Sequence, residues 1–340
     1  MTVSIKDVAK KAGVSVSTVS RALNGYTDVS EKTKRKIQDT VRDLGYVPNE
    51  SAKNLSSKTS RNLALIVLDI YEDDKMDGFT GNILRGIYRY VNEQGNTLAT
   101  YGVGSDMQDD TSLESLCNSY SVIGIVLLGI NVHDEYFRQA NKLSIPCVSV
   151  DILLSGDNNV TVTTDDEAAF EEITDYVIEQ GHEKIALLTG LKEAEVTDKR
   201  NKGFIKSVAK HGLDQSEMDV LECDFLEENA FNIVKAYVEK YGKTRATAFM
   251  CMSDLMALGA CRAIEKCGYK VPEDFSLTGF DGIQALNYIT PGITTVNQNI
   301  KEKGYEAIKV LNDLVDDKEV SRTVYVPYKL DIRDSVKKLK

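Results

Sequence analysis

The stretch DVAKKAGVSVSTVSRALNG, residues 7–25, decides the fold of the N-terminal part of the chain. All seven residues from 14 to 20 are Val, Ser or Thr, which suit a strand or a loop better than a helix. Val19, Ala22 and Leu23 nevertheless recur at helical spacing, and strand alternation would split the apolar side chains between two faces. The segment is therefore predicted to be a helix that packing and capping hold against a weak propensity.

The residues that flank this helix predict two further helices. Ser15 is its natural N-cap, and Gly25 ends it. A capping-box pattern at Ser4 begins a preceding helix that Gly13 stops, so only a tight turn separates the two. A third amphipathic helix is predicted over residues 30–45, and the three together form the helix-turn-helix layout.

The outer face of the second helix suits the major groove of DNA. Small polar side chains and Arg can reach base edges there, and Val16, Ser17 and Arg21 lie on that face. Arg21 is able to bond guanine or phosphate. Thr18 and Ser20, like Ser17, are small enough to let the backbone approach phosphates closely.

The charge distribution also divides the chain. Residues 1–61 carry 12 Lys or Arg against six Asp or Glu, a net charge of +6, whereas the remainder carries −17. A basic head on an acidic body favours a polyanion-binding module joined to a body that avoids polyanions. A merely solvated basic face would have the same composition.

These residues carry a family resemblance. The stretches DVAKKAGVSVSTVSRALNG and VSEKTKRKIQDTVRDLGYVPNESAKNL resemble the DNA-binding head of the lactose/galactose repressor (LacI/GalR) family over about 55 residues. The resemblance implies that Val16, Ser17 and Arg21 read bases. It also implies DNA contacts by Asn24, Asn49 and Lys53, and insertion of Leu55 from a hinge helix into the minor groove.

Two positions of the expected hinge helix depart from the family pattern. Lys53 stands where the family usually has Arg, which keeps the charge but loses the bidentate fork. Ser51 stands where an apolar residue often packs one hinge helix against another. We therefore expect the hinge helix to be less stable in the absence of DNA.

From residue 62 onwards, apolar strands alternate with amphipathic helices. This pattern predicts an α/β fold with doubly wound parallel sheets that bind ligands at the carboxyl ends of their strands. The predicted strands are residues 62–70, 96–102, 121–129, 145–152, 184–190, 246–252 and 275–281, and the predicted helices include 83–95, 168–181, 202–212 and 253–268.

The resemblance continues through this body to about residue 332 and implies the two-lobed fold of periplasmic sugar-binding proteins, joined by three crossing strands. The expected domains are a helix-turn-helix head (1–47), a hinge helix and linker (48–61) and an effector-binding and dimerisation body (62–340). Lobe one is expected over about 62–160 and 291–323, and lobe two over about 161–290 and 324–340. The crossovers are expected near residues 151–162, 288–295 and 324–326.

Six residues match the family's effector-binding positions and are expected to face the cleft: Asp151, Arg200, Phe225, Ser253, Asp281 and Gln298. The Arg200 fork suits a planar pair of acceptors, and Phe225 can stack on the apolar face of a sugar. Two alternatives stay open, because Arg200 could simply pair with Asp198 and Asp281 could cap the following helix. The acidic pairs 165–166 and 171–172 are interpreted as solvated helix starts and faces.

The loop YEDDKMDGF begins at residue 71 and is about five residues longer than in the family pattern. Its acidic part, residues 71–78, is either a solvated loop or a lid that selects a polyhydroxylated or cationic ligand.

Several classes of protein are disfavoured by what the sequence lacks. No nucleotide-binding glycine motif follows a strand, and no catalytic triad or metal-ligand spacing is found, so we expect no enzyme activity, cofactor or metal. The six cysteines are expected to be buried free thiols. The N-terminus has no signal peptide and no segment is long and apolar enough to span a membrane, so a cytoplasmic, nucleoid-associated protein is expected.

The sequence therefore predicts a DNA-binding transcriptional regulator, a repressor that binds a near-palindromic operator as a homodimer. A small effector, a sugar in our interpretation, changes its DNA affinity from the cleft between the lobes. One alternative keeps the DNA role with a purine corepressor or a phosphoprotein partner, and another is a solute receptor without a DNA role. No leucine heptad is appended at the C-terminal end, so a tetramer is not expected.

Overall fold

The computed structural model describes residues 3–23, 26, 28–46, 62–68, 78–108 and 110–339. The chain forms two compact units, Met1–Ser60 and Arg61–Lys340, and each is described by itself. The second unit is referred to below as the body.

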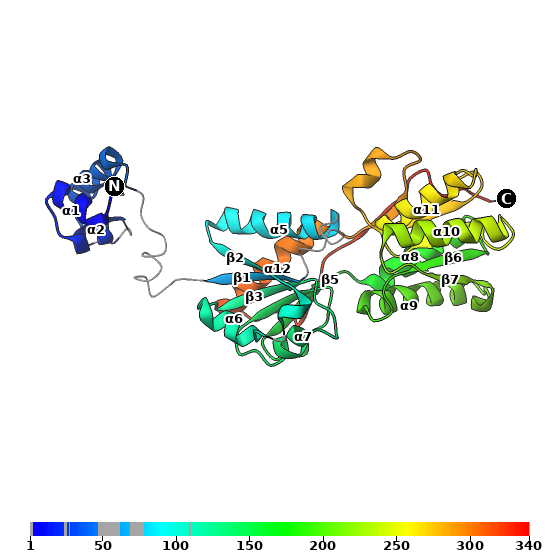
Figure 1. Ribbon diagram of the computed structural model, residues 1–340, viewed down its shortest axis with the longest axis horizontal. Coiled ribbons are helices and arrows are strands. Elements are labelled where there is room, and N and C mark those ends of the chain that lie inside the picture. Colours follow the sequence, from blue (N-terminus) through cyan, green and yellow to red (C-terminus); the bar gives the residue numbers. More distant parts are fainter. Residues whose placement is uncertain are drawn as a thin grey trace. The chain divides into compact units, whose positions relative to one another are not determined.

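The head contains the three predicted helices. They are α1 (Ile5–Ala12), α2 (Val16–Leu23) and α3 (Glu31–Leu44), coloured blue in Figure 1. The capping box of α1 is present at Ser4, and the Ser15 hydroxyl accepts the Thr18 N–H at 3.1 Å at the start of α2. Seven apolar side chains from the three helices and the segment before α3 form the core of the head: Val8, Ala9, Ala12, Val19, Ala22, Val29 and Ile37.

Lobe one of the body is a six-stranded parallel sheet covered on both faces. Along β1 (Leu63–Leu68), alternate side chains enter two different hydrophobic clusters, as expected for a strand buried on both sides. Helices α5 (Gly78–Gln94) and α12 (Ile300–Val315) cover one face, and α6 (Leu113–Ser119) and α7 (Glu135–Ala140) cover the other (Figure 1). The strand order is β11-β5-β4-β3-β1-β2, with β2 (Leu98–Val103), β3 (Gly124–Leu128), β4 (Cys147–Val150), β5 (Asn159–Thr163) and β11 (Thr323–Tyr325).

Lobe two repeats this architecture. Its strands are β6 (Ile185–Thr189), β7 (Asp219–Glu222), β8 (Ala248–Cys251), β9 (Ser276–Asp281), β10 (Thr294–Asn297) and β12 (Lys329–Asp331), in the order β12-β10-β9-β8-β6-β7. Only the edge pair β10 and β12 is antiparallel. Helices α8 (Asp166–Glu179) and α9 (Glu195–Lys210) pair on one side of the sheet, and α10 (Glu227–Tyr241) and α11 (Asp254–Lys266) pair on the other (Figure 1).

Glycines set the distance between these paired helices. A Cβ atom on Gly86 or Gly304 would lie 1.9 or 2.1 Å from a backbone carbonyl oxygen of the partner helix, between α5 and α12. A Cβ atom on Gly203 would likewise collide with the backbone of α8, and one on Gly259 would collide with the backbone of α10. Each helix pair therefore packs backbone to backbone at a position where only glycine fits.

The lobes exchange strands, and the crossovers lie a few residues from where they were expected. Residues up to Thr163 in β5 belong to the sheet of lobe one, so lobe two begins later than residue 161. The expected placement of 291–297 in lobe one was wrong, because β10 pairs with β9 in the sheet of lobe two. The chain crosses between the lobes at residues 164–165, 298–299 and 326–328.

Candidate functional site

The first candidate site is the outer face of α2 in the head. Val16, Ser17 and Arg21 are exposed there, whereas Val19 and Ala22 are buried in the core of the head. This division is the one that the helical spacing predicts. Thr18 and Ser20 are partly exposed beside them.

Arg21 is held by an acidic neighbour that sequence reasoning did not single out. Its Nη1 lies 2.8 Å from Oδ2 of Asp28, in the segment between α2 and α3. Ser15 is hydrogen-bonded to both Ser17 and Thr18 at 2.7 Å, which fixes the first turn of α2.

Other predicted residues lie outside the described part of the chain. These are the DNA contacts Asn24, Asn49, Lys53 and Leu55, and residues 71–77 of the acidic loop.

The second candidate site is a cleft of about 370 Å³ between the two lobes of the body. Five of the six predicted effector residues line it: Asp151, Arg200, Phe225, Ser253 and Asp281. The wall is otherwise largely apolar, with side chains from both lobes: Phe79, Leu128, Ile130, Val132, Val150, Ile152, Leu191, Val196 and Leu255. Its size and its mixed lining are typical of a small-molecule site.

Arg200 is fixed in the cleft by a buried carboxylate. Its Nε donates to Asp166 Oδ1 at 2.7 Å, its Nη1 donates to the Met252 carbonyl, and its guanidinium stacks 4.0 Å from the centre of the Phe280 ring. The interpretation of Asp166 as a solvated helix start was wrong, because its side chain is fully enclosed. The alternative partner Asp198 is bound to a lysine on its own helix. Burial raises the pKa of Asp166 against the pull of Arg200.

Three residues that line the cleft have strained backbone conformations. Asp151, Phe225 and Asp281 have φ values of 62°, 65° and 129°, a region that costs non-glycine residues about 1–3 kcal/mol. The Phe225 ring lies over Gly190, where an added Cβ would come within 2.0 Å of a ring carbon. Strained residues persist where their surroundings over-determine them, and they cluster at active sites, ligand-binding sites and switch regions.

Lys303 joins the two sides of the cleft, and no sequence signal predicted its burial. Its ammonium is fully enclosed and lies 2.8 and 3.0 Å from the two carboxylate oxygens of Asp151 and 2.6 Å from Gln298 Oε1. Gln298 in turn donates to Asp281 Oδ1 at 2.6 Å and accepts from Thr164 at 3.1 Å. The predicted effector residue Gln298 therefore lies behind the cleft wall, in a network that connects Asp151 of lobe one with Asp281 of lobe two.

A second buried carboxylate supports Asp281. Asp254 Oδ2 accepts the N–H groups of Gly282 and Ile283 at 2.7 and 2.8 Å, and its Oδ1 accepts from Thr295 at 2.6 Å. Burial raises the pKa of Asp254 to about 6. Ile283, not Asp281, occupies the N-cap position of the short helix that follows, so Asp281 lies outside the position at which it could cap this helix.

Comparison with known proteins identifies the family of this chain. A model of bacterial regulatory proteins of the lacI family matches residues 4–49, and a model of a periplasmic binding protein-like domain matches residues 174–336. The chain is 30% identical to the transcriptional repressor PurR of Photobacterium profundum, over 98% of this chain and 99% of that protein. It is also 30% identical to catabolite control protein A of Priestia megaterium, over 99% of this chain and 100% of that protein. The chain belongs to the lacI family of bacterial regulatory proteins.

Solved structures of this family have the same fold as the chain. A lac repressor dimer bound to operator and an anti-inducer superposes with a TM-score of 0.85 at 24% identity, covering 99% of this chain and 100% of that one. The regulator CelR in complex with cellobiose gives a TM-score of 0.72 at 25% identity, covering 98% and 99%. The family resemblance and the fold class predicted from the sequence are confirmed, and the chain is a transcriptional regulator with a helix-turn-helix DNA-binding head.

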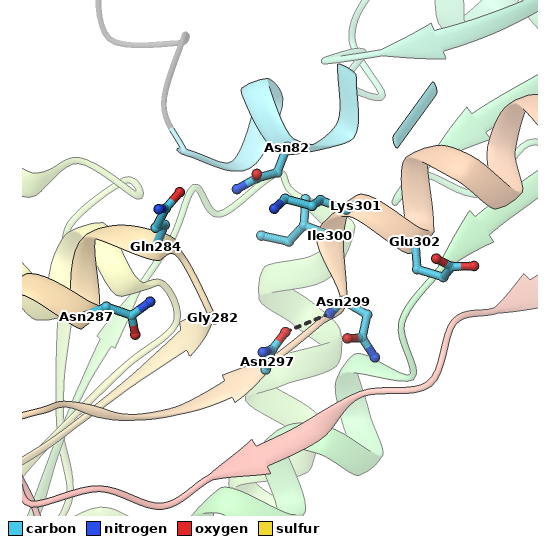
Figure 2. Close-up of a pocket in the computed structure, with 9 residues that line it drawn as sticks. All are labelled: Asn82, Gly282, Gln284, Asn287, Asn297, Asn299, Ile300, Lys301 and Glu302. Atoms are coloured by element: carbon cyan, nitrogen blue, oxygen red, sulfur yellow. Dashed lines mark hydrogen bonds between the residues drawn. The ribbon is translucent and has the colours of Figure 1, made fainter. Parts of the chain in front are cut away.

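A second hollow of the body, of about 490 Å³, differs chemically from the cleft. Figure 2 shows Asn82 of α5 and Lys301 of α12 on one side, facing Gln284 and Asn287 of the short helix η3 (Gln284–Tyr288). Its inner amides are already bonded, as in the 3.0 Å bond that Asn297 Oδ1 accepts from the Asn299 N–H. None of the predicted effector residues lines it.

Other kinds of site find no support in the described ranges. No group of His, Cys, Asp or Glu there is arranged to hold a metal ion. All six cysteines are free thiols, five of them buried, and burial raises the pKa of each. No helix within these ranges is long and apolar enough to cross a bilayer.

Proposed function

We propose that this chain is a repressor that binds a near-palindromic operator as a homodimer and responds to a small effector, a sugar, held between its two lobes. The observation that carries the proposal is the cleft, where five predicted effector side chains from both lobes meet. Relatives of the chain include a transcriptional repressor and a catabolite control protein. The proposal places the protein in the cytoplasm with its DNA and involves no catalytic step.

In the head, we assign base contacts to Val16, Ser17 and Arg21. Thr18 and Ser20 let the backbone approach the phosphates, because both are small and partly exposed on the same helix. From the sequence alone we add DNA contacts by Asn24, Asn49 and Lys53 and a minor-groove wedge at Leu55.

The charges of the cleft favour an uncharged, hydroxyl-rich effector. Two of its four wall carboxylates are paired, Asp151 with Lys303 and Glu195 with Lys199. The one guanidinium of the wall, Arg200, is paired with Asp166, so among the described residues no unpaired cation lines the cleft to bind a phosphate or carboxylate ligand. Arg200 and Asp281 offer fixed donors and acceptors to hydroxyl groups, and Phe225 offers an aromatic face. One solved relative, CelR, is in complex with cellobiose.

A purine corepressor is the second candidate. The PurR relative and the aromatic ring of Phe225 favour it, because a ring can stack on a planar base as well as on a sugar. A phosphoprotein partner and a solute receptor without a DNA role remain as further alternatives.

A face of lobe two suits the homodimer. Tyr288 is 78% exposed, and beside it lies a groove of about 370 Å³. Leu258, Cys261 and Ile289 form its apolar part, and Glu227, Arg262 and Glu265 also line it. An exposed aromatic next to an apolar groove is the composition expected of an interface core.

The experiment is a thermal-shift screen of the full chain followed by a DNA-binding assay. The panel contains cellobiose, ribose, glucose, glucosamine, glucose 6-phosphate, guanine and hypoxanthine. We expect a neutral sugar to raise the melting temperature and then to change the affinity for the DNA upstream of the chain's own gene. A shift with a purine base alone would favour the second candidate, and no DNA binding would contradict the regulator.

A further inference from the structure

The DNA-facing surface of the head contains an ion pair whose acidic member opposes DNA affinity. Arg21 Nη1 and Asp28 Oδ2 are 2.8 Å apart, and the two side chains are 59% and 50% exposed. A carboxylate on this surface repels the phosphate backbone. Asp28 therefore does not contribute to general affinity for DNA, and its contact with Arg21 needs another explanation.

The place of Asp28 is fixed by its neighbours. Val29 is buried in the core of the head, and the Ser30 hydroxyl caps α3 by accepting the Thr33 N–H at 3.3 Å. The carboxylate is thereby held at the edge of a hollow of about 210 Å³ that Ser17, Thr18 and Arg21 also line. The pair thus lies on the same surface as the side chains assigned to base contact.

The pair keeps unused hydrogen-bonding groups. Within the described residues, only Nη1 of Arg21 and Oδ2 of Asp28 have a partner, so the guanidinium retains N–H groups on Nε and Nη2. An Arg fork matches O6 and N7 of guanine, and a carboxylate accepts from N4 of cytosine. Both edges occur side by side in one G·C base pair.

We propose that Asp28 is a specificity-determining residue and that Arg21 and Asp28 together read one G·C base pair. Asp28 orients the guanidinium toward guanine, keeps it from turning to a phosphate, and accepts from the cytosine amino group with its second oxygen. The inference rests on the proposed DNA-reading face of α2. It adds a residue outside the recognition helix to that face.

The test uses the full chain and a random duplex pool from which preferred sites are selected. Affinities for the selected site and for its single-pair variants are then measured by fluorescence anisotropy at several salt concentrations. For the wild type, replacing the G·C pair read by Arg21 lowers affinity by about tenfold or more, as for a good bidentate contact. Arg21→Lys identifies that pair, because lysine keeps the charge and loses the fork.

In Asp28→Ala, discrimination at this one pair falls about tenfold, while affinity for unrelated duplex rises. The slope of log affinity against log salt steepens by about 0.9, because the released Arg21 takes up one phosphate contact. Asp43→Ala is the matched control. It removes the same charge from α3, where Asp43 forms an exposed pair with Lys11 of α1, and it should change affinity for all sequences alike. Circular dichroism verifies that both variants are folded.

Equal effects of Asp28→Ala and Asp43→Ala on discrimination would overturn the proposal. A selected site in which no G·C pair responds to Arg21→Lys would also overturn it. If the wild type enriches no sequence at all, the DNA-reading face itself is wrong, and the proposal fails with it.

Discussion

The buried pair of Lys303 and Asp151 makes the strongest prediction for stability. Lys303→Met keeps the length of the side chain and removes the ammonium that is fully enclosed between Asp151 and Gln298. The Asp151 carboxylate would then keep only the Thr163 hydroxyl, at 2.9 Å, as its partner from the network. Breaking a buried pair from one side costs about 3–5 kcal/mol. We expect about 3 kcal/mol, because the Asp151 side chain is 15% exposed at the cleft and water can reach it.

A double-mutant cycle separates the pair from its surroundings. Asp151→Asn alone leaves the enclosed ammonium without its carboxylate and should cost at least as much as Lys303→Met. The double variant leaves no unpaired charge, so it should be more stable than the sum of the two costs predicts. Contacting residues in one network couple by about 0.5–3 kcal/mol, and we expect a value near 2 kcal/mol here.

The assay is urea unfolding of the four proteins, followed by far-ultraviolet circular dichroism. Lys309→Met on the same helix is the control. Its ammonium pairs with Glu306 at 2.9 Å on the surface, where such a pair is worth less than about 1 kcal/mol. Additive costs within about 0.5 kcal/mol, or a loss from Lys303→Met no larger than the control's, would refute the reasoning.

Four further predictions follow from single residues. Gly304→Ala should cost about 1–3 kcal/mol in urea unfolding, because its Cβ would collide with the α5 backbone. Gly81→Ala, in α5 with no atom within 4 Å of an added Cβ, should instead gain about 0.5–1 kcal/mol, and equal effects would contradict the packing argument. Burial lowers the pKa of His182 below its ordinary value of 6.5, so the contribution of this side chain to stability is present above pH 6.5 and is lost as the pH falls through the lowered pKa. The difference in stability between the wild type and His182→Asn should therefore shrink between pH 7.5 and 5.5. A constant difference would be evidence against this role of His182. Tyr288→Asp should convert the dimer to a monomer in sedimentation velocity, and an unchanged dimer would move the interface elsewhere. Arg200→Lys should abolish the thermal shift with the effector while operator affinity in its absence is retained, and an intact shift would remove Arg200 from the site.

Local sequence signals predicted the head well. The three helices lie where caps and apolar spacing place them, and α2 forms despite its run of Val, Ser and Thr because Val19 and Ala22 pack in the core. Arg21 was predicted to face outward and does so. Its contact with Asp28 was not predicted, because no spacing rule connects a helix face with the loop that follows it.

The body shows where such signals end. Seven of its strands were predicted from apolar runs, but β5, β7, β10, β11 and β12 were not, because these short segments carry no continuous apolar run. β10 was assigned to the wrong lobe, because the lobe to which a strand belongs depends on the strand with which it pairs and not on its own residues. The family motifs predicted five residues that line the cleft, but they did not predict its buried charged residues Asp166 and Lys303. Charged residues on an amphipathic helix are usually solvated, and only the three-dimensional packing shows which of them are enclosed.

We expect this one protein both to bind a specific DNA sequence and to change its affinity for that sequence when a ligand fills the cleft. The most direct measurement is the affinity of the full chain for its selected duplex and for an unrelated duplex, with and without the sugar found by thermal shift. We expect the selected duplex to bind about 10³-fold or more tightly than the unrelated one, and the sugar to change that affinity by about 5–150-fold. Equal affinity for both duplexes, or a sugar that stabilises the body and leaves operator affinity unchanged, would contradict the account.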